Sequence, residues 1–491
     1  MIAAPDIHSA APWRAARDVP TEPLAASPRR ENVADARMLV VAGVVAGLMV
    51  AGMAFGNTTL TLVAVILAFV VAIASPATGL AIIAFAAPLR PPLVVPSPGF
   101  AGFLVAAALL GCVYRMPIDR PAIRPSAPLL LALGFVVYAT VQQLPEMLSG
   151  YAGDEAHVVG YDYGQLITSV GLILVAAYVL RLRRPQPFVV AALGSSLVAA
   201  VLALATSDNQ VAGPISNLVG TSDAIARAVG PFGDPNYFAV FQAAAIVAAV
   251  AWAITLGSRR SRLVLVGVAA VLTSTFAVSL SRGGLLALLA GLLALAFSRD
   301  RRTGFVALAV AIVLALVVYP IYVDWRVTAD ASSASAQAYA SLAESDQSRL
   351  AAALAAPQLF LRSPLFGIGF GHFPYESAWY VGFPIESHNW YLDVLAEEGL
   401  VGVALWIPML LSVAIALHRV ARTPRSIGYA VLTAYVVGCV SLQPPDSFQT
   451  SGLAVLLIVA ALVGRWPPAP AEVGTADPPL GAQPVAVGPG T

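Results

Sequence analysis

The sequence predicts an all-α, polytopic membrane protein with about fourteen transmembrane helices. Of its 491 residues, 59% are hydrophobic and only 11% are charged, whereas soluble domains carry roughly 25% charged residues. Long apolar stretches also recur between Met38 and Gly464, separated by short polar segments. Each can cross a hydrocarbon layer of about 30 Å as a helix. The composition therefore argues against a water-soluble fold.

The expected spans follow these apolar stretches in order. They are residues 38–55, 59–75, 79–95, 100–114, 127–144, 165–180, 187–206, 236–256, 263–280, 283–298, 303–323, 400–417, 426–442 and 450–464. The third span is interrupted by Pro88, Arg90, Pro91 and Pro92. Because proline removes a backbone donor that lipid cannot replace, we expect this helix to end at Ala87.

Both ends of the chain differ from its middle. Residues 1–37 mix Pro, Arg, Asp and Glu with Ala, and residues 465–491 are rich in Pro, Gly and Ala, so we expect two disordered tails. The first segment is too long and too acidic for a cleavable signal peptide, so the helix near Met38 should be the first anchor. The predicted organisation is a tail (1–37), eleven spans (38–323), one large external loop with short helices (324–399), three spans (400–464) and a tail (465–491).

Cysteine and histidine give no sign of a metal site. Cys112 and Cys439 lie within or at the end of apolar stretches, where a small buried hydrophobic residue is the simplest interpretation. The five histidines lack the spacing of zinc ligands. We expect no metal, no disulfide and no cofactor.

The distribution of arginine predicts the orientation of the helices. All 27 basic residues are arginines, and twenty-one of them fall in the first tail, after the last span or in alternate loops. By the positive-inside rule this side faces the cytoplasm, together with both termini. The six on the other side are Arg90, Arg227, Arg282, Arg326, Arg349 and Arg362. Binding of an anionic group at the membrane surface would explain arginines on that side.

The external segment from Asp324 to Gly399 is far longer than the other connections, and function is expected there. Its first half is rich in Ala and Ser, and Ser345 or Asp346 is expected to cap a short helix with Arg349 in its first turn. A Gly-rich, Pro-containing turn follows at residues 363–371.

The segment from Ser387 to Gly399 predicts a helix capped by Ser387 and stopped by Gly399. Its apolar stripe would carry His388 into the protein. A helix N-terminus disfavours imidazolium, so His388 should be neutral and able to act as a general base. The alternative is a histidine that only packs in the capping turn.

Arg282 lies in the sequence Ser-Arg-Gly-Gly at residues 281–284, before a short span that would place it at headgroup depth. Its guanidinium suits a lipid phosphate, and the two glycines would let the phosphate approach the backbone. The alternative is an arginine that anchors a helix at the interface.

Arg227 stands before a Gly- and Pro-rich turn, and a site role and a structural role are equally open for it. Asp234 or Asn236 is expected to cap the next helix. Glu397 and Glu398 are either solvated carboxylates or groups that orient His388 or an acceptor sugar. Arg90, Arg326 and Arg362 are weaker candidates, since snorkelling explains them.

Four motifs carry a resemblance to a known family. They are R-A-V-G-P-F-G-D-P-N-Y-F-A at residues 227–239, S-R-G-G at 281–284, Arg349 followed by S-P-L-F-G-I-G at 363–369, and H-N-W-Y-L-D-V-L-A-E-E-G-L-V-G at 388–402. Their order, and the large external loop before the last three spans, resemble the O-antigen ligase and polymerase family. The resemblance covers roughly residues 38–464.

The resemblance implies a metal-independent, inverting glycosyltransferase in the inner membrane of a bacterium. It would move a glycan from an undecaprenyl-diphosphate carrier to an acceptor hydroxyl outside the cytoplasm, in cell-surface polysaccharide assembly. By matching motif, Arg227, Arg282 and Arg349 would hold the diphosphate, and His388 would activate the acceptor. Asn389, Tyr391, Glu397 and Asn236 are possible supporting residues.

The long cytoplasmic tail, the Ala/Ser-rich loop and the lack of lysine depart from a minimal family member and leave the acceptor open. It can be another glycan, a lipid or a protein; no nucleic-acid partner is expected. A repeat-unit polymerase is the main alternative to a ligase. A transporter is an alternative from another class, but it should place ionisable groups near the membrane midplane, whereas the expected spans are almost free of charge.

Overall fold

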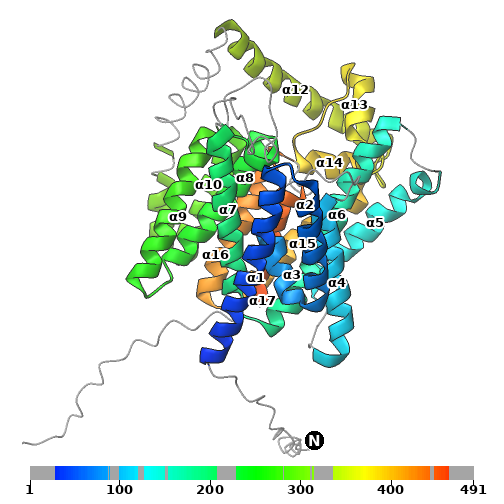
Figure 1. Cartoon of the computed structure of the whole chain (residues 1–491). Coiled ribbons are helices and arrows are strands. Elements are labelled where there is room, and N and C mark those ends of the chain that lie inside the picture. The colour runs from blue at the N-terminus through cyan, green and yellow to red at the C-terminus, as the bar shows by residue number, and fades with distance from the viewer. Residues whose placement is uncertain are drawn as a thin grey trace, which may run out of the picture.

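The structure is a computed structural model that describes residues 28–86, 88, 99–119, 126–149, 153–206, 228–279, 281–309, 312–313, 335–442 and 447–463, and over these residues it is all-helical (Figure 1). The long helices of its first half are α1 (Pro28–Ala54), α2 (Thr58–Ala74), α3 (Pro76–Ala86), α4 (Gly99–Asp119), α5 (Ala127–Ser149), α6 (Gly153–Leu182), α7 (Gln186–Thr206), α8 (Pro235–Ala253), α9 (Arg259–Val278) and α10 (Arg282–Arg299). They are followed by α12 (Ser335–Arg362), α13 (Phe373–Val381), α14 (Trp390–Glu397), α15 (Gly399–His418), α16 (Arg422–Gly438) and α17 (Phe448–Val463), and a short 3-10 turn, η2 (Gly230–Phe232), precedes α8.

Most of the described helices overlap the expected spans, although α6 begins at Gly153, twelve residues before its expected start at 165. Within the described residues, nine helices are long and apolar enough to cross a membrane, and α2, α3 and α17 are shorter apolar helices. The predicted end of the third span at Ala87 agrees with the end of α3 at Ala86. Most of the span expected at 303–323 lies outside the described residues, as does the tail expected at 465–491. The chain is therefore a helical membrane protein, while the count of fourteen stays a prediction.

Helix α1 begins at Pro28, ten residues before the expected start at Met38. The added turns contain Arg, Glu and Ala, which favour helix, and proline is well tolerated in a first turn. Hydropathy detects only the part of a helix that is apolar. The expected tail at 1–37 is thus helical from Pro28 onward.

Helix α8 lies at the centre of the bundle, with most of its side chains buried against α9, α10, α16 and α17. Its small Ala-rich surface lets neighbouring backbones approach closely, as is usual for packed membrane helices. At Gly284 of α10, an added Cβ would lie only 2.4 Å from the Cβ of Ala239. This contact fixes the start of α10 against the start of α8.

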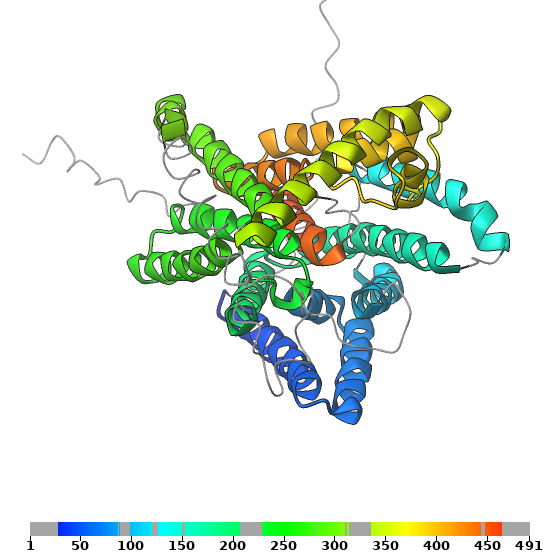
Figure 2. The ribbon, with the colours of Figure 1, turned by 90° about the horizontal axis from the view of Figure 1, so that it is seen from above.

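Helices α12, α13 and α14 cover one end of the bundle, and α12 crosses over it in the view from above (Figure 2). We call this the His388 end. A small apolar core joins α12 to α13 and α14 through Ala352, Ala355, Ala356, Leu359, Phe373 and Ala396. The turn after α12 is tied to α5, since Tyr138 and Gln142 donate to the carbonyl of Phe366 at 2.7 and 2.5 Å.

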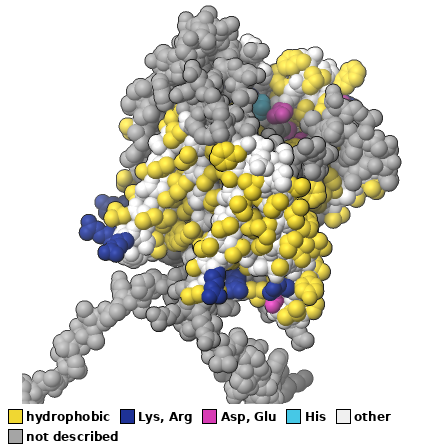
Figure 3. All heavy atoms as spheres, viewed as in Figure 1, with side chains coloured by type: hydrophobic (Ala, Val, Ile, Leu, Met, Phe, Trp, Pro, Cys, Tyr) yellow, Lys and Arg dark blue, Asp and Glu magenta, His cyan; other side chains and the backbone are white. Residues whose placement is uncertain are grey.

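The opposite end carries the described arginine clusters, and Figure 3 shows basic side chains gathered there. We call it the arginine-rich end. Its arginines include Arg115, Arg181, Arg183, Arg184, Arg259, Arg260, Arg262, Arg299, Arg301, Arg302, Arg419 and Arg425. At the His388 end this view shows acidic and histidine side chains (Figure 3).

Candidate active site

His388 lies in the connection between α13 and α14, directly before the residue that caps α14. The cap is Asn389, whose side-chain oxygen accepts from the backbone N–H groups of Tyr391 at 3.0 Å and Leu392 at 3.3 Å. The expectation that Ser387 caps this helix is therefore wrong. Its hydroxyl instead accepts from the N–H of Asn389 at 2.9 Å and shapes the preceding turn. The prediction was misled because serine and asparagine both favour N-caps.

His388 has a φ of 50°, and among the described non-glycine residues it alone has a positive φ. This left-handed conformation costs free energy in a residue with a Cβ, and such strain is concentrated at functional sites. His388 therefore does not sit on the apolar stripe of α14, as its spacing suggested. The turn projects its side chain outside the helix, and the side chain is 34% exposed.

Three charged groups from three parts of the chain surround His388. Its Nδ1 lies 3.7 Å from Oε2 of Glu386, and Arg349 of α12 and Asp234 before α8 interact with it electrostatically. The pKa of His388 is lowered, chiefly by burial and further by Arg349, while Glu386 and Asp234 act in the opposite direction. The direction agrees with the expected neutral imidazole, although burial is the main cause and not the helix dipole alone.

Asp234 and Asn236 connect the charged residues around His388 to the start of α10 at Arg282. Asp234 caps α8 by accepting from the N–H groups of Asn236 at 2.6 Å and Tyr237 at 3.1 Å. Of the two expected caps it is thus Asp234 that serves. The side-chain oxygen of Asn236 accepts from the hydroxyl of Ser281 at 2.8 Å, and Ser281 caps α10, whose first residue is Arg282. A chain of hydrogen bonds therefore places the starts of α8 and α10 beside each other.

Arg349 lies in the interior of α12, a helix of 28 residues, so the expected cap at Ser345 or Asp346 is wrong. The Ala-rich sequence around it is a strong helix former and continues through the expected start. Packing of Ala352 and Ala356 in the small apolar core holds α12 against α14. This contact brings half-buried Arg349 within electrostatic range of His388.

Gly283 and Gly284 do not leave open space for a phosphate. A Cβ on Gly283 would meet the side chain of Ser441 at 2.1 Å, and one on Gly284 would meet Ala239 at 2.4 Å. The glycines are required by close packing of α10 against α8 and the end of α16. The proposed backbone approach of a ligand at these two residues is thus corrected, while Arg282 keeps its place at the first position of α10.

Tyr391 and Asn389 have structural partners. The hydroxyl of Tyr391 donates to the carbonyl of Val436 in α16 at 2.9 Å, and Asn389 caps α14. The N–H of Trp390 donates to the carbonyls of Cys439 and Leu442 at 2.9 and 3.2 Å. These contacts fix the start of α14 on the end of α16 and so hold His388 in place.

Glu397 and Glu398 are buried, with 4% and 0% of their surface exposed, so they are not solvated carboxylates. Glu397 accepts from the N–H of Gly371 at 2.9 Å and of Phe373 at 2.7 Å, which ties α14 to the start of α13. The carboxyl oxygens of Glu398 accept no hydrogen bond from another described residue. Burial, then repulsion from Asp393, raises the pKa of Glu397 well above its usual value. Burial, then repulsion from Glu397 and Asp393, does the same to the pKa of Glu398.

The remaining arginines that we expected outside do not join His388 within the described residues. Arg362, at the end of α12, forms an ion pair with Glu376 of α13. Arg90, Arg227 and Arg326 lie outside the described residues.

Two acidic residues of this region, Glu386 and Asp162, were missed from the sequence. Glu386 stands two residues before His388, and Asp162 of α6 interacts electrostatically with both Glu386 and Asp393. The sequence feature that could have pointed to Asp162 is its position between two tyrosines at the edge of an apolar stretch. Its proximity to Glu386 spans more than 200 residues of sequence, so no local pattern could reveal it. In the described part of the chain, no three His, Cys, Asp or Glu side chains are grouped to hold a metal ion.

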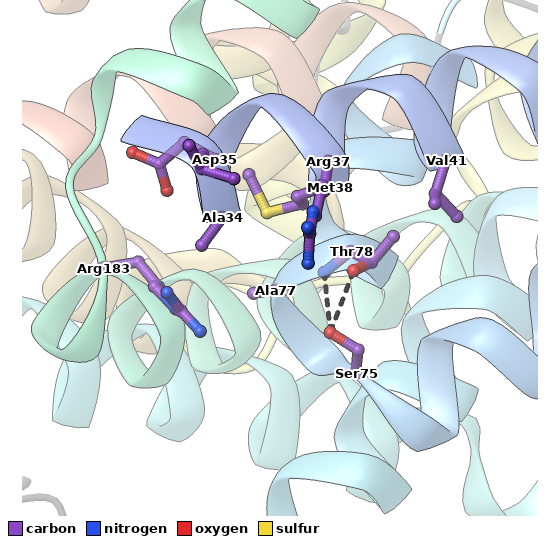
Figure 4. Close-up of a pocket in the computed structure, with 10 residues that line it drawn as sticks. Ala34, Asp35, Arg37, Met38, Val41, Ser75, Ala77, Thr78 and Arg183 are labelled. Atoms are coloured by element: carbon purple, nitrogen blue, oxygen red, sulfur yellow. Dashed lines mark hydrogen bonds between the residues drawn. The ribbon is translucent and has the colours of Figure 1, made fainter. Parts of the chain in front are cut away.

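A cavity of about 770 Å³ lies far from these residues, at the arginine-rich end. Figure 4 shows Arg37 of α1 and Arg183, in the turn after α6, beside Ser75 and Thr78 at the start of α3. The hydroxyl of Ser75 is already within 2.9 Å of the Thr78 hydroxyl and receives the Thr78 N–H at 3.4 Å. Of the described site residues, Arg282, Arg349 and His388 do not line it, so this cavity is separate from the candidate active site.

Comparison with known proteins supports the resemblance inferred from the motifs. Residues 268–407 match the family model described as O-Antigen ligase, and this range contains Arg282, Arg349 and His388. No curated protein matches the chain. The matched range runs from α9 into α15 and includes α12, α13 and α14, the layer that covers the His388 end. The segment from α9 into α15 of this helical membrane protein is therefore similar to the O-antigen ligase family.

Proposed function

We propose that the protein is a membrane glycosyltransferase that moves a glycan from an undecaprenyl-diphosphate carrier to an acceptor hydroxyl, at the outer face of a bacterial inner membrane. The observation that carries this proposal is the grouping of a half-buried histidine with an arginine from α12 and, through Asp234 and Asn236, with the start of α10 at Arg282. These groups lie at the end of the bundle opposite the arginine clusters. By the positive-inside rule this is the extracytoplasmic end.

Arg282 and Arg349 are proposed to hold the diphosphate of the carrier, together with Arg227, which lies outside the described residues. A guanidinium matches phosphate in charge and in fork geometry. The start of α10 also offers the positive end of a helix dipole. Two arginines from different helices can neutralise charge on the leaving diphosphate as the glycosidic bond breaks.

His388 is proposed to take the proton of the acceptor hydroxyl. The acceptor oxygen forms a bond to the anomeric carbon, the bond from that carbon to the phosphate oxygen breaks, and its electron pair leaves with undecaprenyl diphosphate. The proton moves to the neutral imidazole, and attack from the face opposite the phosphate inverts the anomeric centre. Glu386, near Nδ1, is a positioning residue that favours the protonated imidazole and leaves Nε2 for the acceptor.

The test is reconstitution of the purified full-length protein with a diphosphate-linked oligosaccharide and a set of candidate acceptors. We expect transfer in the presence of chelator and without any nucleotide sugar. A requirement for a divalent metal would contradict the proposed electrostatic role of the arginines, and a requirement for a nucleotide sugar would contradict the proposed donor.

A repeat-unit polymerase of the same family is the second candidate, because the same grouping of residues can activate either acceptor. Glycan chains on the carrier in a deletion strain distinguish the two. Long ladders on the carrier would support a ligase, since polymerisation would have proceeded without it. A transporter would instead move the lipid-linked glycan across vesicles without forming a new glycosidic bond.

A further inference from the structure

A second cavity, of about 290 Å³, lies between α5, α6, α15, α16 and α17. Its walls are almost wholly apolar, with Leu, Ile, Val and Met side chains from all five helices. On α17 the lining runs from Ser451 to Val463, which corresponds to about 18 Å at 1.5 Å per residue. One leaflet of a hydrocarbon core of about 30 Å has a similar depth.

The cavity reaches the arginine-rich end of the bundle. Pro128 near the start of α5, Ala416 near the end of α15 and Val463 at the end of α17 all line it. Arg181, in the last turn of α6, lines it as well and is half-buried. Ala416 lies seventeen residues along α15 from the His388 end, or about 25 Å. The cation at this mouth is therefore remote from Arg282 and His388.

Aromatic side chains line the cavity toward the His388 end. The rings of Phe135 and Trp406 line it with centroids 5.4 Å apart, and Trp406 packs on Trp390 at 5.4 Å. Trp390 is the first residue of α14. The cavity thus has a cation at one end of its lining and apolar rings toward the other, a combination that suits a chain with an anionic head and an apolar tail.

We propose that this cavity binds one acyl chain of an anionic phospholipid from the arginine-rich leaflet, with the lipid phosphate on Arg181. An arginine at headgroup depth above an apolar slot of one-leaflet length complements such a lipid in charge and in depth. The prenyl tail of a diphosphate carrier held near Arg282 would enter from the other end. Such a tail would place only hydrocarbon beside Arg181, so it would not complement the positive charge of Arg181.

The experiment is native mass spectrometry of the full-length protein purified in mild detergent and then titrated with phosphatidylglycerol or phosphatidylcholine. We expect the unaltered protein to retain phosphatidylglycerol in preference to phosphatidylcholine. Arg181→Ala should bind it about fivefold more weakly, the usual effect of one arginine on an anionic lipid. Arg181→Lys should retain most of the binding.

Arg184→Ala is the matched control, because Arg184 lies three residues further on, is exposed and does not line the cavity. Equal loss in Arg184→Ala and Arg181→Ala would overturn the proposal, as would unchanged binding in Arg181→Ala. Retention of a polyprenyl phosphate instead of a diacyl lipid would also overturn it.

A second pair of variants tests the slot itself. Ala177→Trp fills the cavity from α6, whereas Val190→Trp places a tryptophan at an exposed position on α7. Loss of the bound phospholipid in the first variant alone supports the proposal. Loss in both, or in neither, contradicts it. These readouts do not depend on glycan transfer, so failure here would leave the proposed function untouched.

Discussion

Among the described residues, most guanidinium groups at the arginine-rich end stand in clusters at or near exposed helix ends, whereas Arg282 and Arg349 at the His388 end come singly, each placed by packing of its helix. Arg299, Arg301 and Arg302 form one such cluster. Arg349, by contrast, lies inside α12 and faces a histidine from another element. Exposed clusters interact with water and anionic lipid and set orientation. A single arginine beside a half-buried histidine is suited to binding one specific anion.

The largest effect should come from removing the two groups proposed to carry the reaction. We expect Arg282→Ala and His388→Ala each to reduce transfer by on the order of a hundred- to ten-thousand-fold, the usual contribution of an acid–base group or a charge-stabilising donor. Arg301→Ala and His418→Ala remove the same side chains at exposed positions of the arginine-rich end. The measurement is the turnover rate of the reconstituted variants. Comparable losses in the two control variants would contradict the expected difference between the His388 end and the arginine-rich end.

Arg349 and Arg362 allow a comparison within one helix. Arg349→Ala should lower kcat/KM for the lipid-linked donor by roughly ten- to a hundredfold, as expected for loss of a hydrogen bond to a charged group. Arg362→Ala should change it little, since Arg362 is 49% exposed and pairs with Glu376 on the surface. If the two variants behave alike, α12 contributes packing only.

The buried carboxyls should make the stability of the His388 end depend on pH. The pKa of the Glu398 carboxyl is raised on folding. The contribution of this carboxyl to the free energy of unfolding is therefore fully present below its pKa in the unfolded chain, about 4.5, and is lost as pH rises through its pKa in the folded protein. Glu398→Gln should therefore stabilise the protein near pH 7 by about 1–3 kcal/mol, and the difference should vanish near pH 4.5. Thermal unfolding across this range measures it. Glu376→Gln, at a partly exposed position, is the control, and an equal gain there would refute the role of burial.

The smallest effect concerns the acid limb of the pH–rate profile. In the proposed mechanism transfer requires neutral His388, and the pKa of His388 is lowered, so activity should persist below the usual histidine value of about 6.5. Glu386 raises this pKa. Glu386→Gln should therefore shift the limb to lower pH and reduce the rate by about tenfold or less. A shift to higher pH would show that Glu386 does not act on His388.

Much of the bundle could be predicted from the sequence, because each apolar stretch is a local signal. The end of α3 before Pro88 followed from the chemistry of proline. The start of α1 did not, since residues 28–37 are polar yet form helix. Likewise, the spacing of Arg349 from Ser345 suggested a new helix, whereas the Ala-rich segment continues one that had already begun.

The candidate site was predictable in part. Its arginines and histidine could be named from motifs, but apart from Glu386 the groups that surround them come from distant segments. Asp162 approaches Glu386 only through packing of α6, and Glu397 bonds Gly371 and Phe373 rather than His388. The glycines after Arg282 serve helix packing. Sequence patterns report a residue's chemistry, whereas its partners depend on tertiary contacts that no local spacing contains.

Because φ of His388 is positive, an alanine variant would change two things at once, the imidazole chemistry and the backbone strain. In a left-handed turn, alanine carries a conformational penalty of about 1–2 kcal/mol, whereas glycine and asparagine adopt it readily. The variants His388→Gly, His388→Asn and His388→Ala all remove the imidazole, but they differ in how easily their backbone adopts this conformation. If the glycine variant folds best and is still inactive, the missing imidazole alone explains the defect.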